Sequence, residues 1–551
     1  MRIRASRLPR STPLAALALA AAATLALTAC QAEPGGSAQE GGTLVYATGD
    51  AEPTCLDPHV GGNYPQALIS TQYLEPLVGR DASGAITPWL ASEWQTSDDG
   101  LTWDFTLKEG IVFTDGTPLD AAALKANIEH LQDPATQSST GYLAVGKVQE
   151  VEVVSATHAR FHLSSPDSAL LESMSQQWTA IQSPAGLARG MEANCKAPIG
   201  TGPFIVSEWV PQDHVTLVRN EDYRTPGPEN DHAGEANGRA HLEKIEWRFI
   251  PDSATRYAAL VSGEVHVIDN PLPADIVAAE KNKTATHIDA PRPGSVNRIE
   301  LNSGQAPFDD ARVREAFIAA ADPDPGIASL FFGTATRSFS PLASTEPTAS
   351  ADERRFATDA AKAERLLDEA GWAKGEDGVR AKDGKRLTVR FPVSTNQSTA
   401  AEQSLFQQIQ ANTAKVGFEV KLEPVDLSTW YGRLAANAYE AVSAPYTKVG
   451  PDVLRILYHS SGIVPAPSGY FANHAQLADP ALDALLDEAS ATLDGAKRTA
   501  LYEQAQQRIL ASRTVLPLYD QQNHFLVNGV SGVTTLGTVA TPTFVNAKLA
   551  K

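Results

Sequence analysis

The sequence predicts a mixed α/β protein built from two or more packed units, and three observations lead to that prediction. The chain of 551 residues exceeds the roughly 100–200 residues of a single domain. Its composition, with 42% apolar and 20% charged residues, is that of an ordinary globular protein. Strand-like and helix-like segments alternate along the chain, with no repeat at the period of a solenoid.

The first predicted elements are strands and one helix. Residues 43–48 form an apolar run that begins the folded chain, and 103–107 alternate apolar and polar residues with period two. In 123–131 the leucines and isoleucine fall on one helical face. The segments 148–154 and 159–163 are expected to pair as a β-hairpin.

The helices of the second half carry recognisable ends. Asp309 and Asp310 precede a helix as N-cap residues, and Asp479 is an N-cap followed by a proline at the first helical position. The apolar spacing of 363–370 predicts a helix that Gly371 ends.

Charge and cysteine content exclude several classes of protein. Lys and Arg number 45 against 65 Asp and Glu, which gives a net charge of −20. A protein that binds a phosphate backbone needs a basic surface, so we expect no nucleic-acid partner. Three cysteines are too few for a disulfide-dense scaffold or a multi-cysteine zinc module.

The N-terminus has the pattern of a secretory signal. A basic segment with four arginines comes before the apolar run 14–27. At about 1.5 Å per residue this run is too short for a hydrocarbon core of about 30 Å, but it suits a signal peptide. We therefore expect residues 1–29 to be removed on export.

The apolar run ends in Leu27-Thr28-Ala29-Cys30, which resembles a bacterial lipobox. Cys30 is the expected lipidation site, and 30–42 the flexible tether. The alternative is an ordinary signal-peptidase site with an incidental cysteine. No later stretch is long and apolar enough to span a bilayer, so we expect an extracytoplasmic protein anchored to the cell membrane by lipid.

The sequence lacks the common catalytic motifs. No G-x-S-x-G, H-E-x-x-H or G-x-x-x-x-G-K-[ST] pattern is present, and Gly200-Thr201-Gly202 is only half of a dinucleotide-binding motif. We expect no catalytic residue, metal site or cofactor, which favours a binding protein. An exported hydrolase that uses two carboxylates stays open as an alternative.

Cys55 and Cys195 remain once Cys30 carries lipid. An oxidising compartment permits a disulfide between them, and closing a loop of ~140 residues would contribute about 4–5 kcal/mol. Two buried free thiols are the alternative.

Ordered motifs across the chain carry a family resemblance. They are Gly42–Val45, Leu56–His59, Tyr73–Leu77, Pro88–Ala91, Asp99–Ile111, Asp115–Leu119, Pro198–Phe204, Phe308–Ala316 and Leu366–Trp372. In this order they resemble family 5 of the solute-binding proteins of ABC importers, the dipeptide, oligopeptide and nickel group, over nearly all of 42–535.

The resemblance implies the fold and the mode of action. It implies a two-lobe periplasmic-binding-protein fold of class II type, with mixed sheets and a hinge between the lobes. Lobe one would comprise 43–292 and 520–551 with an extra subdomain, and lobe two 293–519. A ligand would close the lobes, and the permease subunits of the importer would receive the loaded, monomeric protein.

The ligand class stays open. A peptide is the first candidate, and a metal chelate or an opine-like ligand is the alternative. Dipeptide and oligopeptide receptors of this group place an aspartate where this chain has Thr447, Lys448 and Val449. The resemblance also puts histidine 266 where the family often has aspartate.

Family position and side-chain chemistry together suggest a set of ligand-binding residues. Tyr446 offers a stacking face, and Arg337, Lys448 and Arg455 offer contacts to an anion. Asp452 either forms an ionic contact with a ligand cation or caps the following helix. The full expected set is Pro53, Thr54, Leu56, Arg337, Phe339, Ser340, Tyr446, Thr447, Lys448, Asp452 and Arg455.

Overall fold

The computed structural model describes residues 41–81, 84–224, 238–395, 397–466 and 468–550. The expected signal peptide 1–29, the lipidation site Cys30 and all of the tether except Gly41 and Gly42 lie outside these residues. The described chain is a mixed α/β protein with several sheets, as the sequence predicts.

The largest sheet in the described chain has seven strands in the order β12-β21-β11-β1-β10-β9-β8. β1 lies in its middle and runs parallel to both neighbours, β10 and β11. Tyr46 of β1 is fully buried and stacks on Trp247 of β10, with ring centroids 3.8 Å apart. The strands are β1 (Thr43–Thr48), β8 (Phe204–Val210), β9 (His214–Arg219), β10 (Lys244–Phe249), β11 (Val267–Asp269), β12 (Thr286–Pro291) and β21 (Gln522–Val527).

A second antiparallel sheet has its own apolar core. Its order is β4-β5-β7-β6, and the helix α2 (Ala121–Gln132) packs against β6 and β7. Trp103, Phe105 and Phe161 are buried in this core. The strands are β4 (Ala91–Thr96), β5 (Thr102–Leu107), β6 (Val148–Val153) and β7 (His158–Leu163). The antiparallel pairing of β6 with β7 confirms the predicted hairpin.

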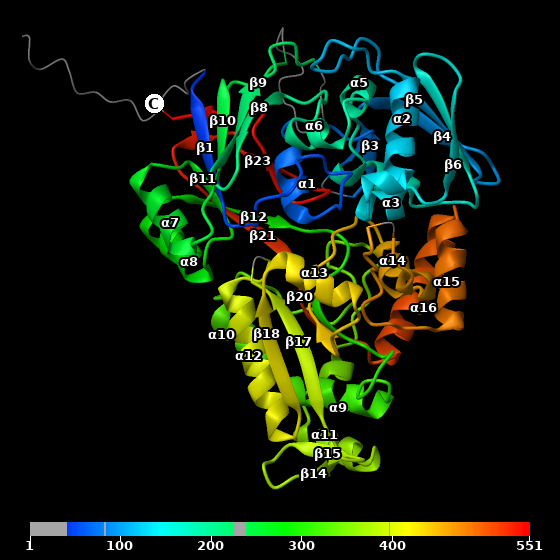
Figure 1. Ribbon diagram of the computed structural model, residues 1–551, viewed down its shortest axis with the longest axis vertical. Helices are drawn as coiled ribbons and strands as arrows, with labels where there is room; N and C mark the ends of the chain where they lie inside the picture. The colour runs from blue at the N-terminus through cyan, green and yellow to red at the C-terminus, as the bar shows by residue number, and fades with distance from the viewer. Residues whose placement is uncertain (1–40, 82–83, 225–237, 396, 467, 551) are drawn as a thin grey trace, which may run out of the picture.

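Two smaller sheets, β19-β13-β20 and β17-β18, and most long helices form the other end of the molecule, drawn below the seven-stranded sheet in Figure 1. One core cluster unites them and contains Ile299, Phe317 and Leu405. The strands are β13 (Asn297–Leu301), β17 (Thr388–Ser394), β18 (Glu419–Val425), β19 (Ala441–Val442) and β20 (Val515–Tyr519). The helices are α9 (Ala311–Ala321), α10 (Asp324–Leu330), α11 (Ala360–Glu369), α12 (Ala400–Lys415), α13 (Leu427–Ala435), α14 (Val453–Tyr458), α15 (Pro480–Ala491) and α16 (Gly495–Ala511).

The helix ends confirm two of the predicted caps. The Asp310 side chain accepts a hydrogen bond from the backbone N–H of Arg312 at the start of α9. The Asp479 side chain accepts from two backbone N–H groups at the start of α15. Gly371 follows the C-cap residue of α11, Ala370, and has a φ of +83°, a left-handed conformation that glycine adopts without strain.

The chain crosses twice between the two ends of the molecule. It leaves the seven-stranded sheet after β12, at Pro291, and enters β13 at Asn297. It returns between Tyr519, the last residue of β20, and Gln522, the first of β21. We use lobe one for the part built on the seven- and four-stranded sheets, and lobe two for the part built on β13, β17–β20 and their helices.

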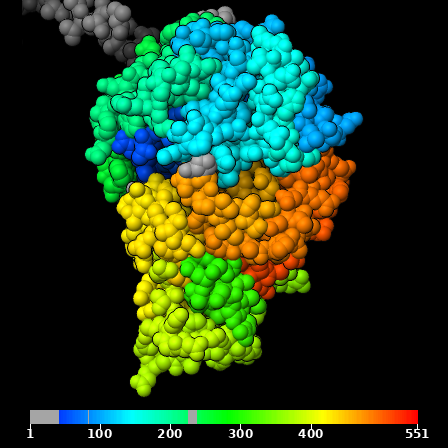
Figure 2. All heavy atoms as spheres, turned by 45° about the vertical axis from the view of Figure 1, so that its right-hand side comes forward, coloured from blue at the N-terminus to red at the C-terminus, as the bar shows by residue number. Residues whose placement is uncertain are grey.

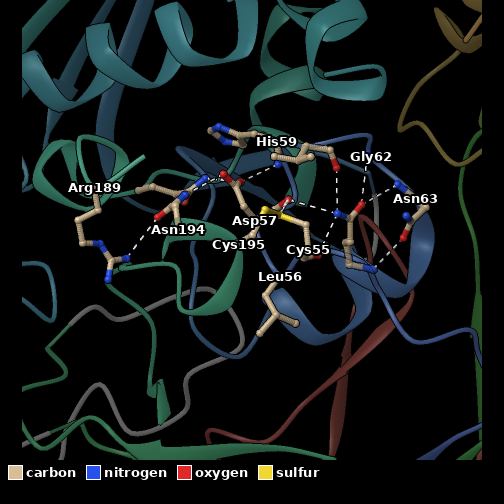
Figure 3. Close-up of a disulfide and its surroundings, with 12 residues drawn as sticks. Cys55, Leu56, Asp57, His59, Gly62, Asn63, Arg189, Asn194 and Cys195 are labelled. Atoms are coloured by element: carbon tan, nitrogen blue, oxygen red, sulfur yellow. Dashed lines mark hydrogen bonds between the residues drawn. A yellow bond between two sulfur atoms is a disulfide. The ribbon is translucent and has the colours of Figure 1, made fainter. Parts of the chain in front are cut away.

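A disulfide fixes the loop that follows β1. The structure joins Cys55 to Cys195, the fifth residue of α6 (Met191–Lys196), across 140 residues of sequence. Figure 3 shows Asp57 beside this bond, where its carboxylate accepts a hydrogen bond from Asn194 Nδ2 at 2.8 Å. The backbone N–H of Leu56 donates to the carbonyl of Cys195. Residues 54–57 are therefore held firmly against lobe one.

No helix among the described residues is long and apolar enough to cross a membrane.

Candidate functional site

A cavity of about 410 Å³ lies where lobe one meets lobe two. Figure 2 shows these lobes in contact along a broad boundary, with yellow and orange segments below blue and cyan ones. Lobe one supplies residues around β1, β11, β12 and β21, together with α1 (Tyr64–Ser70). Lobe two supplies Gln397, two residues of α13, and residues from the segments 445–447 and 468–470. Main lining residues are Asp50, Thr54, Asn63, Tyr64, Thr140, Trp178, Asn270, Arg292, Gln397, Tyr431, Tyr446, Thr447, Tyr470 and Asn523.

A second cavity of about 340 Å³ continues the first. The two share part of their walls, so they form one cleft between the lobes. The residues common to both are Asp50, Asn270, Arg292, Gln397, Pro445 and Asn523.

Arg292 lies at the first chain crossing, directly after β12. Its guanidinium lies over the Tyr64 ring, 4.2 Å from the ring centroid, which is a cation–π contact. Its Nε donates to Thr447 Oγ1 at 2.9 Å, and Nη2 donates to the same oxygen. Burial lowers the pKa of Arg292, while Tyr64 and Asp50 act in the opposite direction. The residue places one cation in the cleft and links the two lobes.

Asp50 faces the same cleft from the turn after β1. Its Oδ1 accepts a hydrogen bond from Asn270 Nδ2 at 2.9 Å, and no described residue forms an ion pair with it. Burial and the nearby charge of Asp269 raise the pKa of Asp50 to about 7, while Arg292 and Arg256 oppose the shift. The cleft therefore contains a carboxyl group and a guanidinium that form no ion pair with each other.

Aromatic side chains supply much of the remaining wall. Tyr431 and Tyr470 of lobe two lie edge to face, with ring centroids 6.0 Å apart. Trp178 of lobe one donates its indole N–H to the carbonyl of Asn63. Tyr446 is only 6% exposed, and its hydroxyl has no hydrogen-bond partner among the described residues. Such a wall offers stacking faces and a free hydroxyl to a ligand.

Of the residues expected from the sequence, Thr54, Tyr446 and Thr447 line the cavity. Pro53 is buried next to Thr54, while Leu56 is fully buried in the apolar core of lobe one. Leu56 follows the disulfide-bonded Cys55 and lines neither cavity; Figure 3 shows its side chain below the bond.

Lys448, Asp452 and Arg455 lie away from both cavities and pair with one another. Lys448 Nζ is 2.9 Å from Asp452 Oδ2, and Arg455 Nε is 2.9 Å from Asp452 Oδ1. Asp452 occupies the N-cap position of α14, but its side chain makes no capping hydrogen bond. Burial would raise the pKa of Asp452, yet the adjacent cations Arg455 and Lys448 hold it well below its usual range. Asp452 therefore does not cap α14, and it lies outside the walls of both cavities.

Arg337, Phe339 and Ser340 also serve lobe two itself. Arg337 Nε donates to Asp324 Oδ1 at 2.6 Å, and its Nη1 donates to the carbonyls of β20 residues 517 and 518. Its guanidinium stacks over the Phe339 ring at 4.3 Å. Ser340 is buried and its hydroxyl donates to Gln506 Oε1. The Arg337 guanidinium, which we expected to contact an anionic ligand, therefore hydrogen-bonds within lobe two.

Sequence reasoning missed Asp50, Tyr64, Asn270 and Arg292. A signal was present for two of them. Asp50 follows the predicted strand 43–48, and Arg292 lies in the predicted lobe crossing. Polar residues just beyond strand ends are well placed to reach a ligand crevice. Among the described residues, no group of three or more His, Cys, Asp or Glu side chains is arranged to hold a metal ion.

Three known proteins illustrate what the chain is similar to. The nickel-binding periplasmic protein of Escherichia coli strain K12 is 29% identical over 475 residues, 84% of this chain and 86% of the relative. Glutathione-binding protein GsiB of Escherichia coli O1:K1 / APEC is 29% identical over 478 residues, with the same two coverages. The crystal structure of NikA from Brucella suis in complex with Fe(III)-EDTA has a TM-score of 0.77 at 28% identity, and the match covers 92% of this chain and 100% of NikA.

The family model "Bacterial extracellular solute-binding proteins, family 5 Middle" matches residues 85–464, more than half of the chain. This range contains the motifs Asp99–Ile111 and Pro198–Phe204, so the resemblance drawn from the sequence is confirmed. The similarity to NikA over nearly the whole chain confirms the predicted two-lobe α/β fold. The chain belongs to family 5 of the bacterial extracellular solute-binding proteins.

Proposed function

We propose that this solute-binding protein captures a short peptide in the cleft between its lobes and delivers it to the permease of an ABC importer. One observation carries the proposal: Asp50 and Arg292 line the same cavity and do not pair with each other. A short peptide carries one ammonium and one carboxylate, which suits such a cleft. The volume of about 410 Å³ lies within the ~300–1,000 Å³ of small-molecule sites.

Capture proceeds by closure of lobe one (43–292 and 520–551) on lobe two (293–519). Thr54 contributes from lobe one, and Tyr446 and Thr447 contribute from lobe two. A ligand that contacts both lobes binds the closed state better and shifts the equilibrium toward it. Arg292, at the crossing, touches Tyr64 and Thr447 at once and is well placed to couple binding to closure.

The protein acts outside the cytoplasm as a monomer, held at the membrane by lipid on Cys30. The lipobox-like Leu27–Cys30 and the polar tether support this part of the proposal. The ligand is passed on chemically unchanged. The described cleft presents binding groups, and the sequence carries none of the common catalytic motifs.

A metal chelate or an opine-like ligand is the second candidate. The similarity to the nickel-binding periplasmic protein and to NikA, solved with Fe(III)-EDTA, favours it. Arg292 would then take a carboxylate of the chelator.

Thermal unfolding with defined probes tests the proposal. The mature protein is heated with tripeptides Ala-X-Ala, with X alanine, leucine, lysine or glutamate, and separately with a nickel–histidine chelate. We expect at least one tripeptide to raise the melting temperature and to be recovered intact. A rise with the chelate alone would favour the second candidate. Hydrolysis of the tripeptides by the pure protein would contradict a binding function.

A further inference from the structure

We infer that Asp50 forms a cation subsite, which binds a primary ammonium group of the ligand and gives up a proton to solvent as it does so. The inference rests on the proposed function and specifies which end of the ligand this part of the cleft holds. It follows from the hydrogen bonds around Asp50, from the other acids of the cleft and from the charges that face it.

Asp50 is the acid of the cleft whose carboxylate remains available. Among the described residues, the acids that line the two cavities are Asp50, Asp252, Glu402 and Asp520. Asp252 caps the helix α7 (Ser253–Ser262), and Asp520 accepts from the hydroxyl and N–H of Ser344. Glu402 completes the capping box of α12 and accepts from Asn297. Asp50 lines the cleft and accepts one side-chain hydrogen bond, from Asn270 at Oδ1, while its Oδ2 has no hydrogen-bond partner among the described residues.

A second carboxylate beneath Asp50 decides where the proton of this pair sits. Asp269 is 3% exposed and accepts from Tyr46 Oη at 2.9 Å, Thr48 Oγ1 at 2.6 Å and Gly49 N at 2.7 Å. Three donors stabilise its ionised form, whereas Asp50 has one side-chain donor. Two neighbouring carboxylates resist simultaneous ionisation, so Asp50 holds the proton of the pair.

Neither of the nearby arginines, Arg256 or Arg292, forms an ion pair with Asp50 among the described residues. Arg256 is 3% exposed and donates to four backbone carbonyls, those of residues 250, 251, 269 and 270. Arg292 donates to Thr447 and lies over Tyr64. The other titratable groups that face Asp50 are the phenols of Tyr46 and Tyr64, whose pKa values burial raises. A ligand ammonium is therefore the group that can neutralise Asp50 in the cleft.

Proton release on binding can be measured directly and also makes the affinity depend on pH. Asp50 is half-ionised near pH 7, so it is mostly neutral at pH 5.5. An ammonium needs the carboxylate, and binding at pH 6 would therefore expel about 0.9 proton per ligand. Affinity for a free-amine ligand should rise about fifteenfold from pH 5.5 to pH 7. Above pH 8 it should fall again, since an α-amino group loses its proton near pH 8.

Calorimetric titration of the mature protein tests this directly. The probes are the Ala-X-Ala tripeptides, the same tripeptides with acetylated N-termini, and the nickel–histidine chelate. Titrations at pH 5.5, 6 and 7, in buffers of different ionisation enthalpy, give both the affinity and the protons released. The variant is Asp50→Asn, and Asp98→Asn is the matched control, because Asp98 is an exposed acid of lobe one that lines neither cavity.

For the wild-type protein we expect tight binding of a free-amine tripeptide, proton release, and at least about tenfold weaker binding of its acetylated form. Asp50→Asn should weaken binding of the free-amine ligand by at least about tenfold at pH 7 and abolish its rise between pH 5.5 and 7, while Asp98→Asn behaves as wild type. Equal affinity of Asp50→Asn, or of the acetylated tripeptide, would overturn the inference. Binding of the chelate alone would also overturn it but leave a solute-binding function intact. Binding of no probe would contradict the proposed function itself.

Discussion

At the scale of single residues, the buried carboxylate of Asp452, which we expected near a ligand, pairs with two cations of its own lobe. Its side chain is 1% exposed and lies between Lys448, 2% exposed, and Arg455. The three residues have the i, i+3 and i, i+4 spacing of groups that meet on a helix, a signal for mutual pairing already present in the sequence. Charges buried this deeply stabilise the fold only as a complete set.

Removal of one partner should therefore reduce stability. We predict that Lys448→Met lowers the free energy of unfolding by about 3 kcal/mol, since it leaves a buried carboxylate with one cation instead of two. Denaturant unfolding at pH 7 measures the loss. Lys497→Met is the matched control, because Lys497 forms a surface ion pair with Glu488 and should cost less than about 1 kcal/mol. Equal losses in both variants would contradict this role of Lys448.

His59 makes lobe one sensitive to acid. It is fully buried; Nε2 is 2.9 Å from the carbonyl of Ala180 and Nδ1 is 3.1 Å from His130 Nδ1. Burial, together with the charge of His130, lowers the pKa of His59 to about 4, against the influence of Asp57. The unfolded chain binds this proton near pH 6.5 and the folded chain does not, so stability falls as the pH drops from about 6.5 to 4.

We predict that His59 accounts for about 2 kcal/mol of the stability lost between pH 7 and pH 4.5. Urea unfolding of wild type and His59→Gln at both pH values measures it. The variant should be less stable at pH 7 and should lose less on acidification. Parallel losses in the two proteins would show that His59 does not carry this pH dependence.

At the scale of elements, the loop after β1 depends on its disulfide. The bond between Cys55 and Cys195 joins positions 140 residues apart in the sequence. Thr54, which lines the cavity, directly precedes Cys55. We predict that the double variant Cys55→Ser/Cys195→Ser loses about 4 kcal/mol of unfolding free energy. Denaturant titration in the absence of reductant measures this. A change below about 1 kcal/mol would contradict a structural role for the bond.

Local signals predicted the elements better than the site. β1, the β6–β7 hairpin and the caps at Asp310 and Asp479 each depend on residues that are close in sequence. The cleft instead joins Asp50 with Arg292, which lie far apart in the chain and meet only because β1 and β12 share a sheet. For the same reason the sequence could not show that Arg337 donates hydrogen bonds to the backbone of β20.

At the scale of the whole molecule, the proposed mechanism involves the two chain crossings and the lipid anchor. The crossings flank the cleft, and Arg292 lies in one of them. The proposed anchor would keep the loaded protein near the permease.

We predict that Cys30→Ser moves the protein from the membrane fraction to the soluble fraction or leaves an uncleaved precursor. Cell fractionation checks this, with Cys195→Ser as the control that keeps the anchor. Equal membrane retention of the Cys30 variant would contradict lipidation.

The central claim is that a charged ligand binds in the cleft that Asp50 and Arg292 share. Calorimetric titration of wild type and Arg292→Gln, with the free-amine tripeptides and their C-terminal amides, tests it most directly. The account predicts one ligand per wild-type protein, with at least about tenfold weaker binding both for Arg292→Gln and for the amide, because each lacks one half of a charged hydrogen bond. Wild-type affinity in Arg292→Gln would contradict the account.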